Sequence, residues 1–183
     1  MNESEKIMRA FPSHLKENVL SLTGKMTLQG KLHSNSFEVI LNGERLVIPS
    51  RIYFNEPTAW QIWRLNKTET LILNCLFTRH HDGFVRQKRL KNILSADDYW
   101  ITPYVMQLLG EYVQEILITI KDNLSEKMLH NFIRFIGENP EYFETTKSRI
   151  TSYWDCYYRS KFPNKEGYVG FEILAEISRS VRT

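Results

Sequence analysis

The apolar side chains of this chain change their spacing once, and that change sets the fold class. Between residues 37 and 48 they alternate with polar or smaller neighbours on either side of Asn42-Gly43. Asn-Gly between alternating runs is the strongest short-range signal for a two-residue hairpin turn, because both turn positions need a positive φ. We expect further strands over residues 26–32 and 51–54. With the hairpin, these strands would form a three- or four-stranded antiparallel sheet, in which Pro49 ends one strand or confines it to an edge.

From Asn66 onward the spacing is helical. Helix starts are indicated by Asn66 with Glu69, by Thr102-Pro103, by Ser125 and by Asn139-Pro140. These starts predict helices from 67 to a stop at Asp82-Gly83, over 84–94, over 102–120, over 125–137, from 140 past Tyr157, and over 171–181. Residues 1–22 carry another helical stripe, which Pro12-Ser13 divides and Gly24 ends.

These patterns predict an α+β protein that is predominantly α. A small N-terminal antiparallel hairpin or sheet packs on a C-terminal helical bundle or on a short solenoid-like array of helical hairpins. Helical pairs begin near residues 67, 102 and 140, which is the rhythm of stacked hairpins, although no residue pattern recurs between them. We expect an N-terminal helix and sheet over 1–65 and a helical domain over 66–183, joined in one continuous fold.

Composition and charge exclude a disordered chain and a chain with a strongly charged tail. Of 183 residues 42% are hydrophobic, which can fill a core and excludes wholesale disorder. The net charge is +3, and residues 1–66 carry eight bases and six acids against sixteen and fifteen in residues 67–183. This even spread argues against a polybasic arm or an acidic tail.

The sequence favours a reducing cytoplasm. No secretory signal is visible in the acidic first residues, and the most apolar stretch, 98–121, contains Glu111 and Glu115 near its centre. Each of these carboxylates would cost roughly 2.5–3.5 kcal/mol to insert into a membrane, so this stretch is expected to be a buried helix. Two isolated cysteines, Cys75 and Cys156, make neither a disulfide framework nor a zinc site.

The tripeptide His80-His81-Asp82 is the first candidate for chemistry. A His-Asp pair is the centre of the HD phosphohydrolase metal site, which also needs an upstream His and a downstream Asp. His14 or His33 and Asp122 are the available partners. In the alternative interpretation, Arg and His interact with the carbonyls at a helix C-terminus, while Gly83 reverses the chain in a left-handed conformation. We favour this structural interpretation and expect no metal and no cofactor.

The basic stretch 86–91 is the second candidate. Residues 68–113 can be interpreted as a winged-helix or helix-turn-helix module whose Arg86, Lys88, Arg89 and Lys91 contact nucleic acid. The next helix, however, which would enter the major groove, has no Lys or Arg over residues 103–111. We therefore expect these bases to form an ordinary solvated helix face.

Two further groups have ordinary explanations. Glu111 and Glu115, with Gln107 and Gln114, are expected to form the one polar stripe of the helix over 102–120, since neither Glu has a His three residues on. A stacking platform for a ligand is one interpretation of the aromatic group Tyr153, Trp154, Tyr157 and Tyr158. Helical spacing with Phe143 and Ile150 favours the other, in which Tyr157 is core and Tyr158, off that stripe, is exposed. No phosphate loop, dinucleotide fingerprint, nucleophile elbow or metalloprotease motif occurs.

We therefore expect a non-enzymatic protein-interaction or scaffold protein whose partner is another protein and not a membrane. Its remaining Tyr, Trp and Arg residues are the types that interface hot spots use. The alternatives are a metal-dependent hydrolase centred on His80, His81 and Asp82, and a nucleic-acid-binding protein that uses Arg86, Lys88, Arg89 and Lys91. No motif assigns the chain to a family.

Overall fold

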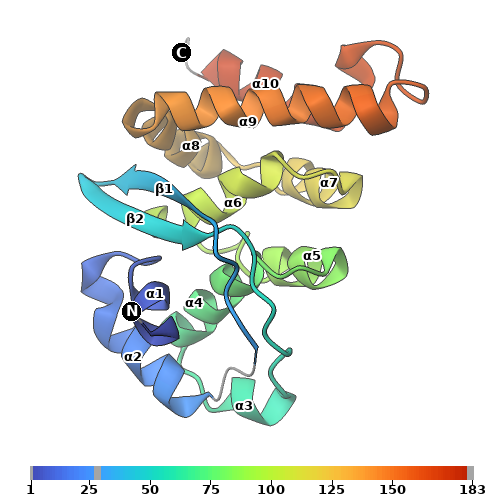
Figure 1. The fold of residues 1–183 in the computed structure, drawn as a ribbon. Coiled ribbons are helices and arrows are strands. Elements are labelled where there is room, and N and C mark those ends of the chain that lie inside the picture. The colour runs from blue at the N-terminus through green and yellow to red at the C-terminus, as the bar shows by residue number, and fades with distance from the viewer. Residues whose placement is uncertain (1, 27–29, 181–183) are drawn as a thin grey trace. The chain divides into compact units, whose positions relative to one another are not determined.

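The computed structural model, drawn in Figure 1, describes residues 2–26 and 30–180. The chain divides into two compact units. Unit 1 comprises residues 1–93 and unit 2 comprises residues 94–183. The boundary expected at residues 65/66 lies inside unit 1, because helix α4 (Lys67–Phe77) packs against helix α2 (Lys16–Lys25) and against helix α5 (Gly83–Lys91). The fold is α+β and mostly helical, as the sequence predicts.

Unit 1 combines short helices with one hairpin. Its other elements are α1 (Glu3–Met8), η1 (Ser13–Leu15), β1 (Ser36–Leu41), β2 (Glu44–Pro49) and α3 (Ala59–Trp63). The N-terminal helical stripe is divided near Pro12, as expected, but α2 continues past Gly24 to Lys25.

The hairpin at Asn42-Gly43 is confirmed. Strands β1 and β2 are antiparallel with Leu41 opposite Glu44, and the two turn residues have φ of 55° and 79°. The alternation places four apolar side chains of the two strands in the core: Val39, Leu41, Leu46 and Ile48. Strand β2 ends at Pro49, as the sequence predicts.

The expected wider sheet is wrong, since the sheet in the described residues has two strands. Residues 27–29 of the strand expected over 26–32 lie outside the described residues, and Leu32 pairs with Ile52 in a single isolated bridge. The N–H of Ile52 donates to the Arg79 carbonyl at 2.9 Å, and its carbonyl accepts from the N–H of His81 at 3.0 Å. On its other side, the N–H of His33 donates to the Arg51 carbonyl and the N–H of Tyr53 donates to the Lys31 carbonyl, each at 2.9 Å. Both pairings of Ile52 are single bridges, so neither is long enough to add a strand to the hairpin.

Helix α4 begins as predicted but ends earlier. The Asn66 side chain accepts from the N–H of Glu69, and the Glu69 side chain accepts from the N–H of Asn66, which completes a capping box. The helix ends at Phe77, and Asp82 caps the start of α5 instead of ending α4. Gly83 is consequently the first residue of a helix, and the positive-φ glycines of the described chain are Gly30 and Gly43. The left-handed turn expected at Gly83 is wrong.

Unit 2 is a helical bundle. Its elements are η2 (Tyr99–Ile101), α6 (Thr102–Leu109), α7 (Gln114–Asp122), α8 (Glu126–Glu138), α9 (Pro140–Tyr153), η3 (Trp154–Tyr158), η4 (Lys165–Gly167) and α10 (Val169–Ser180). Both α6 and α10 contact α7, α8 and α9. In a solenoid each repeat contacts its neighbours alone, but α10 contacts α7 as well as the α8–α9 pair that precedes it, which is the packing of a bundle.

The single helix expected over 102–120 is wrong. All eight residues of α6 are buried, and the helix stops at Leu109 with Gly110 at its C-terminal cap. A Cβ at Gly110 would lie 3.1 Å from Cδ of Arg149 on α9, so the break is a close approach between two segments of the bundle. Of the four residues expected to form one polar stripe, Gln107 lies on α6, Glu111 lies in the connection after it, and Gln114 and Glu115 begin α7, so one continuous helix does not carry them.

The next two helices begin as predicted. The Ser125 side chain accepts from the N–H of Met128, and Pro140 is the first residue of α9. The Asn139 side chain does not cap α9; its Nδ2 donates to the carbonyl of Phe135 at 3.0 Å and so holds the end of α8.

The expected exposures of Tyr157 and Tyr158, which follow α9, are wrong. Tyr157 is 64% exposed, whereas Tyr158 is half-buried and its hydroxyl donates to the carbonyl of Tyr112 at 2.6 Å. Residues 154–158 form one π-helical turn, in which each hydrogen bond spans one more residue than in an α-helix. The buried positions of this segment, Thr146, Ile150 and Trp154, are spaced by four residues, and Tyr158 continues that spacing.

Candidate functional site

The turn His80-His81-Asp82 follows α4 and leads into α5 in unit 1. His80 lies beside Ile52 in an isolated parallel bridge, and its side chain is 5% exposed. Its Nδ1 accepts a hydrogen bond from the N–H of Asp82 at 3.1 Å, so the neutral ring carries its proton on Nε2. Nε2 then donates to the carbonyl of Phe54 at 3.0 Å. Both ring nitrogens are used by the backbone, which leaves neither lone pair for a metal ion.

Burial holds the pKa of His80 below its ordinary value of 6.5. The hydrogen bond to Phe54 acts in the opposite direction but does not compensate for the lost hydration. His80 is therefore a neutral imidazole that connects the turn to the extended segment before α3.

The other two residues of the turn also have structural contacts. The ring of His81 stacks on Tyr53 with centroids 5.1 Å apart, and Oδ1 of Asp82 accepts from the N–H of Phe84 at 2.8 Å. Across residues 2–26 and 30–180, no group of three or more His, Cys, Asp or Glu side chains is placed to hold a metal ion. His14 and His33 therefore do not complete a site with this turn.

Two of the four candidate nucleic-acid ligands are buried. Arg86 is 1% exposed, and its Nη1 donates to the carbonyls of His80 and His81, each at 2.9 Å. Arg89 is 3% exposed; its guanidinium donates to Glu56 at 2.9 Å and to Asn74 at 3.3 Å. These two arginines stabilise the interior of unit 1 and do not face a phosphate backbone.

The remaining two bases of α5 are exposed lysines. Nζ of Lys88 lies 3.1 Å from Oε2 of Glu56. Burial raises the pKa of Glu56, but hydrogen bonds from Lys88 and Arg89 outweigh it and bring that pKa below its ordinary value. Lys91 lies at the C-terminal end of the helix, where a cation interacts well with the exposed carbonyls. The solvated basic face expected from the sequence is thus reduced to Lys88 and Lys91.

An exposed aromatic pair on α3 is a candidate site that sequence reasoning missed. Trp60 is 63% exposed and Trp63 is 81% exposed. A spacing of three residues places both side chains on one face of the helix. The guanidinium of Arg64 lies 4.8 Å from the centroid of the Trp60 ring, a distance at which it is attracted to the π-system.

The conformation of α3 is fixed by its own sequence. The side chain of Thr58 accepts from the N–H of Gln61, and the side chain of Gln61 accepts from the N–H of Thr58 at 2.8 Å. This capping box holds a five-residue helix that would be unstable in isolation. Thr58 and Gln61, three residues apart around Trp60, are the signal that could have located the site from sequence.

Comparison with known proteins assigns no relative. No protein-family model matches the chain, and no curated protein or solved structure matches it. The described residues contain no helix with the length and apolarity needed to span a membrane.

Proposed function

We propose that this protein is a non-enzymatic interaction protein that binds another protein through the tryptophan face of α3, defined by Trp60 and Trp63. The observation that supports the proposal is the outward placement of two tryptophans on a capped helix. Tryptophan and arginine are enriched in interface hot spots, and Arg64 lies against this face.

The energy available from covering this face is large. A tryptophan contributes about 150–250 Å² of surface, so covering the exposed parts of both removes roughly 300 Å² from water. At about 25 cal/mol per Å², that burial contributes roughly 7–8 kcal/mol before the entropy of association is subtracted. Two side chains could therefore supply most of the affinity of a specific complex.

The positive charge around the tryptophan face indicates the kind of protein surface that it would bind. Arg64 and Lys67 are exposed beside it, and residues 57–68 contain no Asp or Glu. Counted over the units, residues 1–93 carry 14 bases and eight acids, whereas residues 94–183 carry ten bases and 13 acids. We therefore expect the partner to present an acidic protein surface with apolar pockets for the two indoles.

The proposed compartment is the cytoplasm. Cys75 is buried in α4 and Cys156 is exposed, and both are free thiols. An exposed free thiol is typical of a protein that works under reducing conditions.

The experiment compares the wild-type protein, W60A/W63A and the control variant Y157A as baits in a cell extract treated with nuclease. Tyr157 is a matched control, since it is an aromatic residue of similar exposure in unit 2. A protein retained by wild type and Y157A but lost by W60A/W63A is then purified and its dissociation constant measured. We expect the double variant to weaken binding by about 30-fold or more, the effect of losing a single hot spot.

Two results would contradict the proposal. One is equal affinity of the purified partner for wild type and W60A/W63A. The other is retention that disappears on nuclease treatment, which would identify the surface as a nucleic-acid site. Circular dichroism of the double variant checks that α3, which buries no residue of its own, has not altered the fold.

A further inference from the structure

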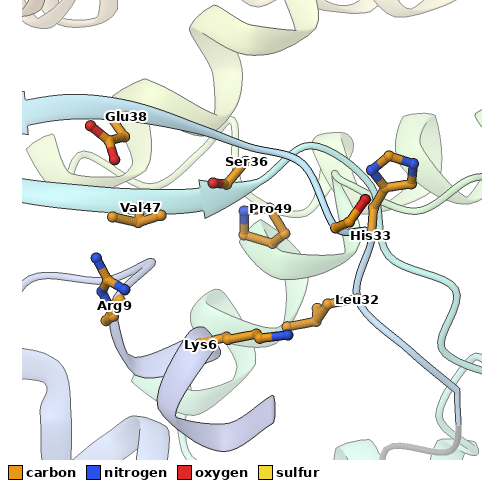
Figure 2. A pocket seen from close by; sticks show the side chains of 9 residues that line it. Lys6, Arg9, Leu32, His33, Ser36, Glu38, Val47 and Pro49 are labelled. Atoms are coloured by element: carbon orange, nitrogen blue, oxygen red, sulfur yellow. The ribbon is translucent and has the colours of Figure 1, made fainter. Parts of the chain in front are cut away.

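A second, separate feature of unit 1 is a pocket between the end of α1 and the hairpin. Figure 2 shows Lys6 and Arg9 on the α1 side, Ser36 and Pro49 on the hairpin side, and His33 at one end. The pocket has a volume of about 250 Å³, which is room for a small organic molecule rather than for a single water.

Hydrogen bonds donated by backbone N–H groups hold the walls of this pocket in place. The N–H of Val47 in β2 donates to the carbonyl of Arg9 at 2.8 Å, which joins the hairpin to the end of α1. The N–H of Leu32 donates to Oε1 of Glu3 at 3.1 Å, which joins the segment before β1, a third wall of the pocket, to the same helix. The pocket is therefore formed before any ligand arrives, as most small-molecule sites are.

The polar groups around the pocket are mainly donors. Lys6 and Arg9 lie one helical turn apart, and among the described residues no side chain accepts a hydrogen bond from Nζ of Lys6. Nδ1 of His33 accepts from the N–H of Asn35 at 3.0 Å, so its neutral ring presents Nε2 as a donor. The hydroxyl of Ser34 donates to Oδ1 of Asn35 at 3.3 Å, and the hydroxyl of Ser36 is a further donor at the pocket.

The acid at the pocket is already paired. Glu38 forms an ion pair with Arg45 across the hairpin, in which Nε of Arg45 lies 3.0 Å from Oε2. The side chains that line the pocket therefore include two bases, Lys6 and Arg9, against one acid that is paired with Arg45. The remaining walls are apolar and come from Leu32, Val47 and Pro49.

We infer that this pocket binds a small phosphate monoester. Two cations, the imidazole of His33 and the hydroxyl of Ser36 match the charge and the three terminal oxygens of a phosphate, which forms strong charge-assisted hydrogen bonds. The apolar walls accommodate the organic group that the phosphate carries. The inference does not depend on the tryptophan face, since no residue is shared between the two sites.

The test is a titration of the full chain, followed by amide NMR, with phenyl phosphate, inorganic phosphate, benzoate and uncharged benzyl alcohol. We expect phenyl phosphate to shift the amides of residues 33–36 with a dissociation constant on the order of 1 mM or tighter. Inorganic phosphate and benzoate should each bind more weakly, since each lacks one half of the ligand. Benzyl alcohol should leave these amides unchanged.

Two matched double variants distinguish specific binding in the pocket from non-specific attraction of an anion to a basic protein. K6Q/R9Q removes both cations of the pocket, and K67Q/K91Q removes two exposed cations of unit 1 outside it. We expect K6Q/R9Q to weaken phenyl phosphate binding by about tenfold or more, the effect of losing hydrogen bonds to a charged ligand, with K67Q/K91Q close to wild type. The single variant K6Q, whose side chain has no protein partner in the described chain, gives the same comparison if K6Q/R9Q does not fold.

The inference fails if residues 33–36 show no shift with phenyl phosphate. It also fails if both double variants weaken binding equally, since that result would reflect net charge alone. Equal binding of benzoate and phenyl phosphate would show a general carboxylate or anion pocket and would overturn the assignment to phosphate.

Discussion

The neutral imidazole of His80 should make the stability of the protein fall as the pH drops below about 6.5. Protonation at Nδ1 would place an N–H against the N–H of Asp82, which donates to that nitrogen over 3.1 Å. The folded protein therefore resists protonation, and the pKa of His80 is lowered mainly by burial. In the unfolded chain the same ring takes up a proton near pH 6.5, so acid favours unfolding.

The magnitude follows from proton linkage. Stability from this group is fully present above the unfolded pKa and is lost as the pH falls below it, until the lowered pKa of the folded state is reached. If the folded state takes up no proton in this range, the free energy of unfolding falls by about 1 kcal/mol between pH 6.5 and pH 5.5. Glu56 and Glu69, whose pKa values are also lowered, lose their contribution below their ordinary values near 4.5 and so do not contribute in this range.

The assay is urea denaturation at several pH values for wild type and for H80Q. Glutamine can still donate to the Phe54 carbonyl but cannot titrate, so H80Q should be less stable at neutral pH and should lose about 1 kcal/mol less than wild type between pH 6.5 and 5.5. Parallel pH profiles for the two proteins would refute the proposed hydrogen-bonding state of His80.

Three further predictions use the same measurements. Gly43→Val should lower the free energy of unfolding by about 1–2 kcal/mol, because φ is 79° at this turn. Gly83→Ala, at the start of α5, should change the free energy of unfolding by less than about 0.5 kcal/mol. A larger loss for Gly83→Ala than for Gly43→Val would place the strained turn at Gly83. Leu108→Ala should cost roughly 2–5 kcal/mol in urea denaturation, since this side chain is fully buried in α6; a loss under about 1 kcal/mol would show that the bundle interior is not packed there. A chelator should leave the thermal melting curve unchanged, because both nitrogens of His80 are bonded to the backbone; a drop in Tm would show a structural metal.

Local sequence signals determined where most elements of this protein begin. The hairpin follows from Asn42-Gly43 because only a few residue types adopt positive φ, and the start of α4 follows from Asn66 with Glu69 because both hydrogen bonds of the cap lie within four residues. The starts at Ser125 and Pro140 follow for the same reason. Such signals act over a single turn of backbone and need no partner from elsewhere in the chain.

The tertiary structure decided where elements end and which polar groups are buried. Asp82-Gly83 resembles a helix stop, but α4 already ends at Phe77, and His80 and His81 bond to the backbone of residues 52–54. Arg86 and Arg89 belong to a basic run in sequence, yet both are buried because carbonyls of the preceding turn, Asn74 and Glu56 accept their hydrogen bonds. The break at Gly110 likewise depends on its close approach to Arg149, and the inward position of Tyr158 goes with the hydrogen bond from its hydroxyl to the Tyr112 carbonyl. These features depend on contacts between residues distant in sequence, which periodicity and local propensity do not encode.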